Sequence, residues 1–196
     1  MSFQVYREPA TDPAVPFALL LLHGTGGTER DLVEIGKALV PGAAIVSPRG
    51  KVQESIYTRW FRRFEEGVFD EDDIRRQADD LAEFVKGENQ RFVAIGYSNG
   101  ANMGAALMTL YPEVLEGLVM WRGMQLFREP VQSDLTGKKI LMTNGTVDPM
   151  GPLESARRQA EIFRTGGADV TLRELGTGHG LTQSDFEITR EWLSKF

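Results

Sequence analysis

Short apolar segments alternate with amphipathic ones along almost the whole chain, and this alternation restricts the fold more than any other feature. Several of the apolar segments are nonpolar at nearly every position, as expected of parallel strands buried on both faces. They occupy residues 17–24, 43–50, 91–98, 116–123, 138–145 and 169–175. Helical periodicity between and after them covers residues 31–40, 70–86, 101–111, 153–164 and 184–196. Strands that alternate with helices in this way predict right-handed crossovers and a doubly wound, mostly parallel sheet with helices on both faces.

The segment at residues 3–9, FQVYREP, adds a further strand, which we expect at the sheet edge in antiparallel orientation. This gives an α/β fold with a sheet of about seven strands. A length of 196 residues suggests a single domain over residues 1–196. The insertions between strands are short, so we expect no large lid over a site.

Composition narrows the class of protein. The chain is 41% hydrophobic and 26% charged, with a net charge of −6, which argues against a nucleic-acid partner. It contains no cysteine, which excludes disulfides, thiolate metal sites and a cysteine nucleophile. The longest apolar run, residues 17–22, is too short for stable membrane insertion. The N-terminus lacks the apolar segment of a secretory signal, so a cytoplasmic location is expected.

The pentapeptide Gly96-Tyr97-Ser98-Asn99-Gly100 directly follows one apolar segment and precedes a helical one. A strand that ends at a serine, followed by a helix, is the context that exposes a nucleophile on a sharp turn. Such a turn strains the backbone at the serine and requires small residues two positions away on either side. Gly96 and Gly100 meet that need. The alternative is that Ser98 only caps the helix.

A serine hydroxyl needs a base to become an effective nucleophile. Of the two histidines, His179 follows the last expected strand and lies between two glycines, as suits a loop that presents an imidazole. The alternative is a solvated surface histidine.

The acid should follow a strand between the serine and the histidine. Asp148 comes just after the strand at 138–145 and would hold His179 in the correct tautomer. Glu129 is the second choice, and the alternative for Asp148 is a turn residue before Pro149. The order Ser98, Asp148, His179 is the one expected on a sheet of this type.

An oxyanion hole would use the backbone N–H that follows the nucleophile and another from the loop after an early strand. These belong to Asn99 and, in the loop HGTGG, to Thr25. We expect His23 to shape this loop through hydrogen bonds rather than to take part in the chemistry.

Other glycine-rich motifs do not fit this loop. A dinucleotide fingerprint that starts at Gly24 would require glycine where Glu29 stands, and HGTGGTER lacks the Gly-Lys-Ser/Thr of a phosphate-binding loop. With two histidines and no cysteine, the sequence offers no metal constellation, and we expect neither metal nor cofactor.

Six blocks in order, HGTGG, SPRG, RWFRRFEEGVFDEDD, GYSNGAN, NGTVDPM and GHGLTQ, resemble the carboxylesterase/phospholipase branch of the α/β-hydrolases. That branch includes the acyl-protein thioesterases, and the likeness is greatest to its small bacterial members of the hydroquinone-responsive type. The resemblance runs from about Ala18 to Trp192. It implies the α/β-hydrolase fold, the triad Ser98, Asp148 and His179, and backbone donors at Thr25 and Asn99.

Residues 51–69 form the longest segment without periodicity, and they follow a strand end, so they should border the site. Apolar side chains from this segment and from other loops are candidates to bind an acyl or alcohol group: Trp60, Phe61, Met103, Met124, Met150 and Leu181. For Phe61 and Phe64 the alternative is that they cover the core. Arg59, Arg62 and Arg63 could hold a substrate carboxylate, but structural ion pairs with nearby acids are the favoured interpretation.

The sequence therefore predicts a serine hydrolase that cleaves short-chain carboxylic esters, about C2 to C6, through an acyl-enzyme. Alternatives are a thioesterase or lysophospholipase with the same triad, or a non-catalytic ligand receptor on a hydrolase fold. The expected partner is a small-molecule ester. An exposed apolar edge could also support a homodimer.

Overall fold

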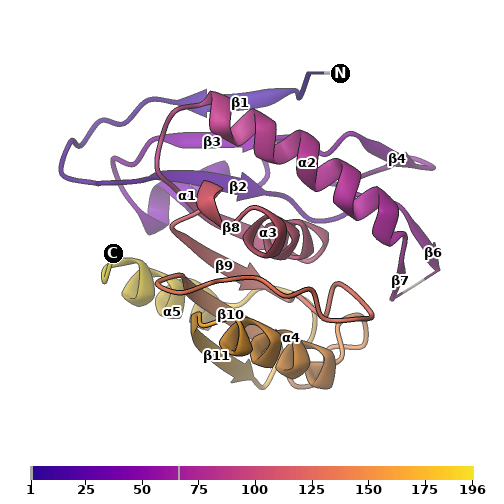
Figure 1. The fold of residues 1–196 in the computed structure, drawn as a ribbon. Helices are drawn as coiled ribbons and strands as arrows, with labels where there is room; N and C mark the ends of the chain where they lie inside the picture. The colour runs from indigo at the N-terminus through magenta and orange to yellow at the C-terminus, as the bar shows by residue number, and fades with distance from the viewer. Residues whose placement is uncertain (1, 66) are drawn as a thin grey trace.

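A seven-stranded sheet with strand order β1-β3-β2-β8-β9-β10-β11 forms the centre of the protein (Figure 1). It is seen in a computed structural model that describes residues 2–65 and 67–196. Strand β1 pairs with β3 in antiparallel orientation, and the other neighbours are parallel. The strands are β1 (Val5–Glu8), β2 (Ala18–Leu22), β3 (Ile45–Pro48), β8 (Phe92–Tyr97), β9 (Gly117–Trp121), β10 (Lys139–Gly145) and β11 (Asp169–Leu175). The predicted sheet and its antiparallel edge strand are confirmed.

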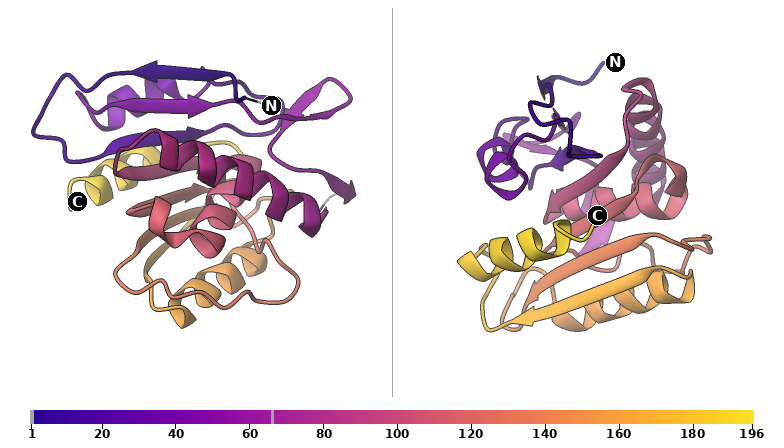
Figure 2. Two further views of the ribbon diagram at one scale, coloured as in Figure 1. Left: turned by 45° about the horizontal axis from the view of Figure 1, so that its top comes forward. Right: turned by 90° about the vertical axis from the view of Figure 1, so that its left-hand side faces the viewer.

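Helices cover both faces of this sheet (Figure 2). They are α1 (Val33–Leu39), α2 (Glu71–Gly87), α3 (Asn99–Leu110), α4 (Leu153–Thr165) and α5 (Gln183–Leu193), with a short 3₁₀ turn η1 (Pro112–Val114). Helices α1 and α5 lie on one face, and α2, α3 and α4 lie on the other. None of the helices in the described part of the chain combines the length and the apolar character needed to cross a membrane.

Strand β2 shows why the central strands are apolar at consecutive positions. Leu19 and Leu21 pack into the core beneath α1 and α5, whereas Leu20 and Leu22 pack into the core beneath α2, α3 and α4. Successive side chains of a strand point to opposite faces, and here both faces are covered.

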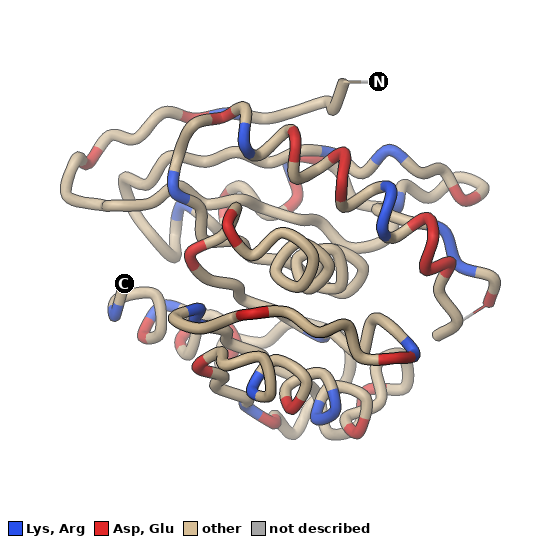
Figure 3. Tube along the Cα trace, viewed as in Figure 1, with Lys and Arg blue, Asp and Glu red and all other residues tan. Residues whose placement is uncertain are grey.

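Helix α3 is buried along nearly its whole length and carries no charged residue, so it appears uniformly tan in Figure 3. Its small residues allow close packing on the sheet: a Cβ at Gly104 would lie only 2.6 Å from Leu118 Cδ1. This contact keeps the helix that follows Ser98 tight against β9.

The segment expected to be irregular, residues 51–69, instead forms two small antiparallel hairpins. They are β4 (Val52–Glu54) with β5 (Tyr57–Arg59), and β6 (Arg63–Glu65) with β7 (Val68–Phe69). In Figure 1 they lie at the right, on the side to which the arrow of β2 points. Strands of two or three residues are too short to show an alternating pattern, which is why periodicity did not predict them. The hairpins stand beside the carboxyl ends of the parallel strands, where ligands bind in sheets of this type.

Candidate active site

Three side chains from three separate loops form a hydrogen-bonded chain at the carboxyl edge of the sheet. Ser98 lies between β8 and α3, Asp148 follows β10, and His179 lies between β11 and α5. The Oγ atom of Ser98 is 3.0 Å from Nε2 of His179, and Nδ1 of His179 is 2.7 Å from Oδ2 of Asp148. The fold thus brings together the three residues that were predicted to act together.

The backbone of Ser98 adopts φ 54° and ψ −115°, a conformation that non-glycine residues rarely take. The flanking glycines are required by contact with backbone atoms. A Cβ at Gly96 would lie 2.4 Å from the carbonyl oxygen of Gly100, and a Cβ at Gly100 would lie 2.0 Å from that of Leu22. A larger residue at either position would force backbone atoms to shift, so glycine suits both positions of this turn, which raises the Ser98 side chain toward His179.

Asp148 is oriented by its own loop. Its side chain is fully buried, and its Oδ1 atom accepts the backbone N–H groups of Met150 (2.9 Å) and Gly151 (3.1 Å). Its Oδ2 atom is then directed at His179, so the imidazole donates its Nδ1–H to Asp148 and keeps Nε2 as an acceptor for Ser98. Glu129, the second choice for the acid, is exposed in the segment after β9.

Tyr97 contacts His179 through both its hydroxyl and its ring, and the sequence did not suggest this contact. Its hydroxyl donates to the backbone carbonyl of His179 at 3.1 Å, and the two rings are 5.5 Å apart. Burial raises the pKa of Tyr97, so the phenol remains a donor at neutral pH. The ring needs the glycine at position 24, where a Cβ would lie 2.8 Å from Tyr97 Cδ1.

Thr25 and Asn99 both line the cavity beside Ser98. Their side chains bind neighbouring groups: Thr25 Oγ1 accepts from Arg59 Nη1 at 3.1 Å, and Asn99 Oδ1 accepts the backbone N–H of Trp60 at 2.7 Å. Each side chain thus ties a segment of the hairpin region to the residues around Ser98.

His23 is almost completely buried and is fixed by two backbone groups. Its Nδ1 atom is 2.7 Å from the carbonyl oxygen of Gly24 and so carries the proton, while Nε2 accepts the N–H of Gly50 at 3.0 Å. Burial lowers the pKa of His23, so the ring stays neutral. These contacts shape the loop after β2, which is the role that the sequence suggested.

A cavity of about 100 Å³ adjoins the hydrogen-bonded chain. Its wall contains Ser98 and His179 together with Thr25, Arg59, Arg63, Phe69, Asn99, Asn102, Arg122, Met124 and Met150. Two of the six apolar residues expected to bind substrate, Met124 and Met150, therefore lie at the cavity.

The other four expected binding residues lie elsewhere, which corrects the sequence-based expectation. Trp60, Phe61 and Met103 are 2%, 0% and 0% exposed and belong to the core beneath α2 and α3. Trp60 is held there because its Nε1 donates to the carbonyl of His23 at 2.9 Å. Leu181 packs half-buried against the core on the side of α1 and α5. Phe69 at the end of β7 supplies the aromatic wall instead.

The three arginines of the hairpin segment separate into two groups. Arg62 lies outside the cavity lining and binds Asp70 at 2.8 Å. Arg59 and Arg63 line the cavity, and both contact Glu54, at 3.1 and 3.0 Å. All three arginines thus form ion pairs, which was the favoured interpretation. Two of them, Arg59 and Arg63, do so at the wall of the candidate site.

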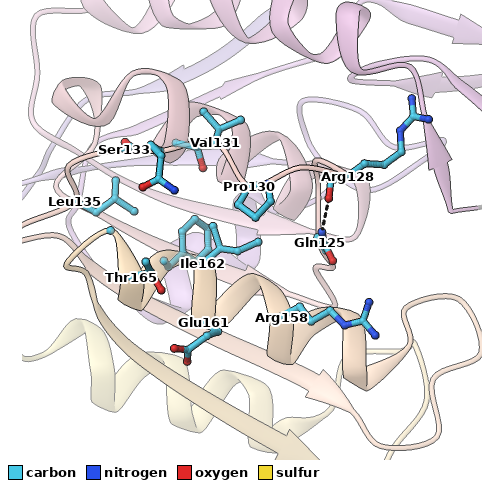
Figure 4. Close-up of a pocket in the computed structure, with 14 residues that line it drawn as sticks. Gln125, Arg128, Pro130, Val131, Ser133, Leu135, Arg158, Glu161, Ile162 and Thr165 are labelled. Carbon is cyan, nitrogen blue, oxygen red and sulfur yellow. Dashed lines mark hydrogen bonds between the residues drawn. The ribbon is translucent and has the colours of Figure 1, made fainter.

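A larger cavity, of about 430 Å³, lies between α4 and the segment after β9 (Figure 4). Pro130, Val131 and Ile162 form its apolar wall, and Arg158 and Glu161 lie on α4 at its edge. None of the three hydrogen-bonded residues lines it. The smaller cavity is nevertheless the candidate active site, because the serine and the imidazole of the hydrogen-bonded chain line it.

Across residues 2–65 and 67–196, no group of three or more histidine, aspartate or glutamate side chains is arranged to hold a metal ion.

Comparison with known proteins gives the family. A model of the phospholipase/carboxylesterase family matches residues 9–196. The protein MhqD of Bacillus subtilis (strain 168) is 37% identical over 198 residues, which cover 97% of each chain. The crystal structure of the Bacillus cereus carboxylesterase aligns with 98% of this chain and 94% of its own, at 35% identity and a TM-score of 0.94. YahD aligns over 99% of both chains, at 25% identity and a TM-score of 0.89.

These matches extend over nearly the whole chain and include the strands and loops that carry Ser98, Asp148 and His179. The chain therefore belongs to the phospholipase/carboxylesterase family of α/β-hydrolases.

Proposed function

We propose that this hydrolase is a serine carboxylesterase that acts through an acyl-enzyme intermediate. The observation that carries the proposal is the continuous chain of hydrogen bonds from Ser98 through His179 to Asp148. A nucleophile within 3.0 Å of a base, with the base oriented by a buried carboxylate, is an arrangement that activates a serine for attack on an ester.

In the first half of the reaction, Ser98 Oγ attacks the ester carbonyl while His179 Nε2 accepts the hydroxyl proton. The negative charge that develops on the carbonyl oxygen is stabilised by the backbone N–H groups of Thr25 and Asn99. His179 then donates its proton to the departing alcohol, and the acyl group remains on Ser98.

In the second half, a water molecule takes the place of the alcohol. His179 accepts a proton from the water, which attacks the acyl-enzyme, and the carboxylic acid leaves as Ser98 is restored. Asp148 accepts the Nδ1–H of His179 and stabilises the imidazolium in both halves.

The size of the cavity supports short acyl chains. Its volume of about 100 Å³ is well below the roughly 300–1,000 Å³ of pockets that enclose drug-sized ligands. We expect p-nitrophenyl esters with acyl groups of about C2 to C6 to be the best substrates. Maximal kcat/KM at C12 or longer would overturn this expectation.

A fluorophosphonate probe tests the nucleophile directly, because it reacts only with an activated serine. The wild-type protein should form one covalent adduct, located on Ser98 by peptide mass spectrometry. The Ser98→Ala variant should remain folded, form no adduct and lose at least about 10⁴-fold in kcat. An unlabelled wild-type protein would favour a receptor without catalytic activity.

A second candidate substrate class is suggested by the charge of the cavity wall. Arg59 and Arg63 contribute to the wall, and Glu54, which both of them contact, is not among the lining residues. YahD, which has the same fold, was solved with malic acid, a dicarboxylic acid. Esters whose acyl part carries a carboxylate would place that group near the guanidinium groups. Paired charged and neutral esters of equal length distinguish this class from simple short-chain esters.

A further inference from the structure

Arg122 follows directly after β9, is 1% exposed, and has a positive φ of 57°. A buried arginine in a strained backbone conformation requires compensating contacts. Its main partner is Asp185 in the first turn of α5. Arg122 Nη1 and Nη2 bind Oδ1 and Oδ2 of that carboxylate, each at 2.7 Å, and neither side chain is exposed.

The same guanidinium binds the backbone on both sides of His179. Its Nε donates to the carbonyl of Gly178 at 3.1 Å, and its Nη2 donates to the carbonyl of Gly180 at 2.8 Å. Nη1 also donates to the carbonyl of Thr143 at 3.1 Å. These bonds and the two to Asp185 match the five N–H donors of a guanidinium, so the group has no donor left for a substrate.

Asp185 also binds Thr182, in the segment that follows His179. Its Oδ2 accepts the backbone N–H of Thr182 at 2.7 Å and the hydroxyl of Thr182 at 2.9 Å, and its Oδ1 accepts from the hydroxyl of Thr143. Burial alone would raise the pKa of Asp185, but hydrogen bonds from Arg122, Thr143 and Thr182 outweigh it and hold this pKa below its usual value. The carboxylate therefore stays ionised and balances the charge of Arg122.

The two glycines beside His179 have open space where a side chain would begin, so backbone contacts must fix them. A Cβ at Gly180 would meet nothing within 4 Å, and one at Gly178 would meet only the carbonyl oxygen of Val147, at 3.9 Å. Two flexible residues thus flank an imidazole that must keep contacts of 2.7 and 3.0 Å with its partners. Displacement of a reacting group by about 1 Å can cost roughly 10²-fold in rate.

We propose that Arg122, held by Asp185, is a positioning residue for His179: by binding the carbonyls of Gly178 and Gly180 it helps to set the imidazole between Ser98 and Asp148. This inference rests on the proposed function of His179 as the base. It assigns to the buried ion pair a role in catalysis beyond its contribution to the fold.

The Arg122→Lys variant tests the proposal, because lysine keeps the charge but cannot bind two carbonyls and a carboxylate in the same geometry. We expect kcat to fall about 10- to 100-fold with KM changed less than about twofold. The rate of Ser98 labelling by fluorophosphonate should fall in proportion to kcat.

Thr189→Val is the matched control for stability. It removes the bond from Trp121 Nε1 to Thr189 Oγ1, 2.9 Å long, which also links the end of β9 to α5 but does not touch the His179 loop. This variant should lower Tm and keep kcat. A folded Arg122→Lys variant whose kcat stays within twofold of wild type would overturn the proposal.

Proton NMR of the two histidines supplies a readout that a merely structural role would not change. The Nδ1–H of His179 bonds Asp148, and that of His23 bonds Gly24, so His23 is an internal reference. In Arg122→Lys, the His179 signal should broaden or shift while the His23 signal stays in place. Unchanged signals from both histidines would contradict the proposal.

If Arg122→Lys fails to fold, Asp185→Asn takes its place, since it preserves the shape of the carboxylate and removes its charge. The same fall in kcat and the same change in the His179 signal are expected, and their absence overturns the proposal. Failure of the proposed function would look different, because wild-type protein would then leave Ser98 unlabelled.

Discussion

Gly100 lies against the backbone of the neighbouring strand: a Cβ at this position would be 2.0 Å from the carbonyl oxygen of Leu22 and 2.4 Å from that of His23. The first turn of α3 thus presses on the end of β2, next to the residue that bears the proposed nucleophile. Both carbonyl oxygens belong to the backbone and not to the mobile end of a side chain. Neither can therefore shift without displacing the end of β2.

Gly100→Ala should therefore destabilise the protein by about 3 kcal/mol, because backbone atoms must shift to admit the methyl group. Urea unfolding measures this change. Gly87→Ala is the matched control: it lies at the last residue of α2, where a Cβ meets nothing within 4 Å. The control should be neutral or stabilising by up to about 1 kcal/mol. Equal stability of the two variants would contradict the steric account.

The glycines around Ser98 show why part of the site could be predicted from the sequence. Gly96, Ser98 and Gly100 are close in the chain, and the turn they form depends mainly on the strand and helix that flank it. Asp148 and His179 were found because each follows an apolar strand, and the carboxyl ends of parallel strands meet at one edge. A local pattern and the topology together placed these residues near one another.

The substrate side of the site could not be predicted in this way. Trp60 was expected in the pocket because it is aromatic and follows a strand end, but its position depends on distant partners. It is drawn inward by the carbonyl of His23 and by the side chain of Asn99, 37 and 39 residues away in the chain. Arg122 was missed for the same reason, since Asp185, 63 residues later, accounts for its burial.

The Asp148→Asn variant removes the charge of Asp148 and changes the favoured tautomer of His179, but it leaves the geometry of the loop around residue 148 intact. The amide oxygen can still accept the N–H groups of Met150 and Gly151, so the free energy of unfolding should change little. The amide N–H₂ would then face His179 Nδ1 and favour the tautomer that cannot accept the proton of Ser98. We expect kcat to fall about 10⁴-fold, measured with p-nitrophenyl acetate.

Asp148→Ala is the control for that experiment, because it also leaves the two backbone N–H groups without their acceptor. It should lose both activity and stability. A kcat of Asp148→Asn within tenfold of wild type would show that the carboxylate does not orient His179.

His23 should make stability depend on pH. Its pKa is lowered in the folded state by burial, so the unfolded chain binds a proton more readily. Its contribution to stability is present above the unfolded value of about 6.5 and declines as the pH falls from there toward the folded pKa. The decline cannot exceed about 1.4 kcal/mol per pH unit for one proton.

His23→Gln removes the titrating group while keeping a donor and an acceptor in the side chain. Urea unfolding of both proteins between pH 7.5 and about 5 should give a flatter profile for the variant. The two proteins differ only at residue 23, so the difference between the profiles reports His23. Parallel profiles would show that protonation of His23 is not linked to unfolding.

Arg63 and Arg62 are adjacent in sequence, but only Arg63 lines the cavity, so the pair offers a test of the charged-substrate class. Monoethyl succinate and ethyl butyrate differ mainly in a terminal carboxylate in place of a methyl group. If that carboxylate binds near Arg63, Arg63→Gln should lower the ratio of kcat/KM for the succinate ester to that for the butyrate ester about tenfold. Arg62→Gln should leave the ratio unchanged, because Arg62 binds Asp70 outside the cavity.

The ratio removes any general loss of activity from the comparison. An equal ratio in wild type and Arg63→Gln would exclude Arg63 as the group that binds the substrate carboxylate.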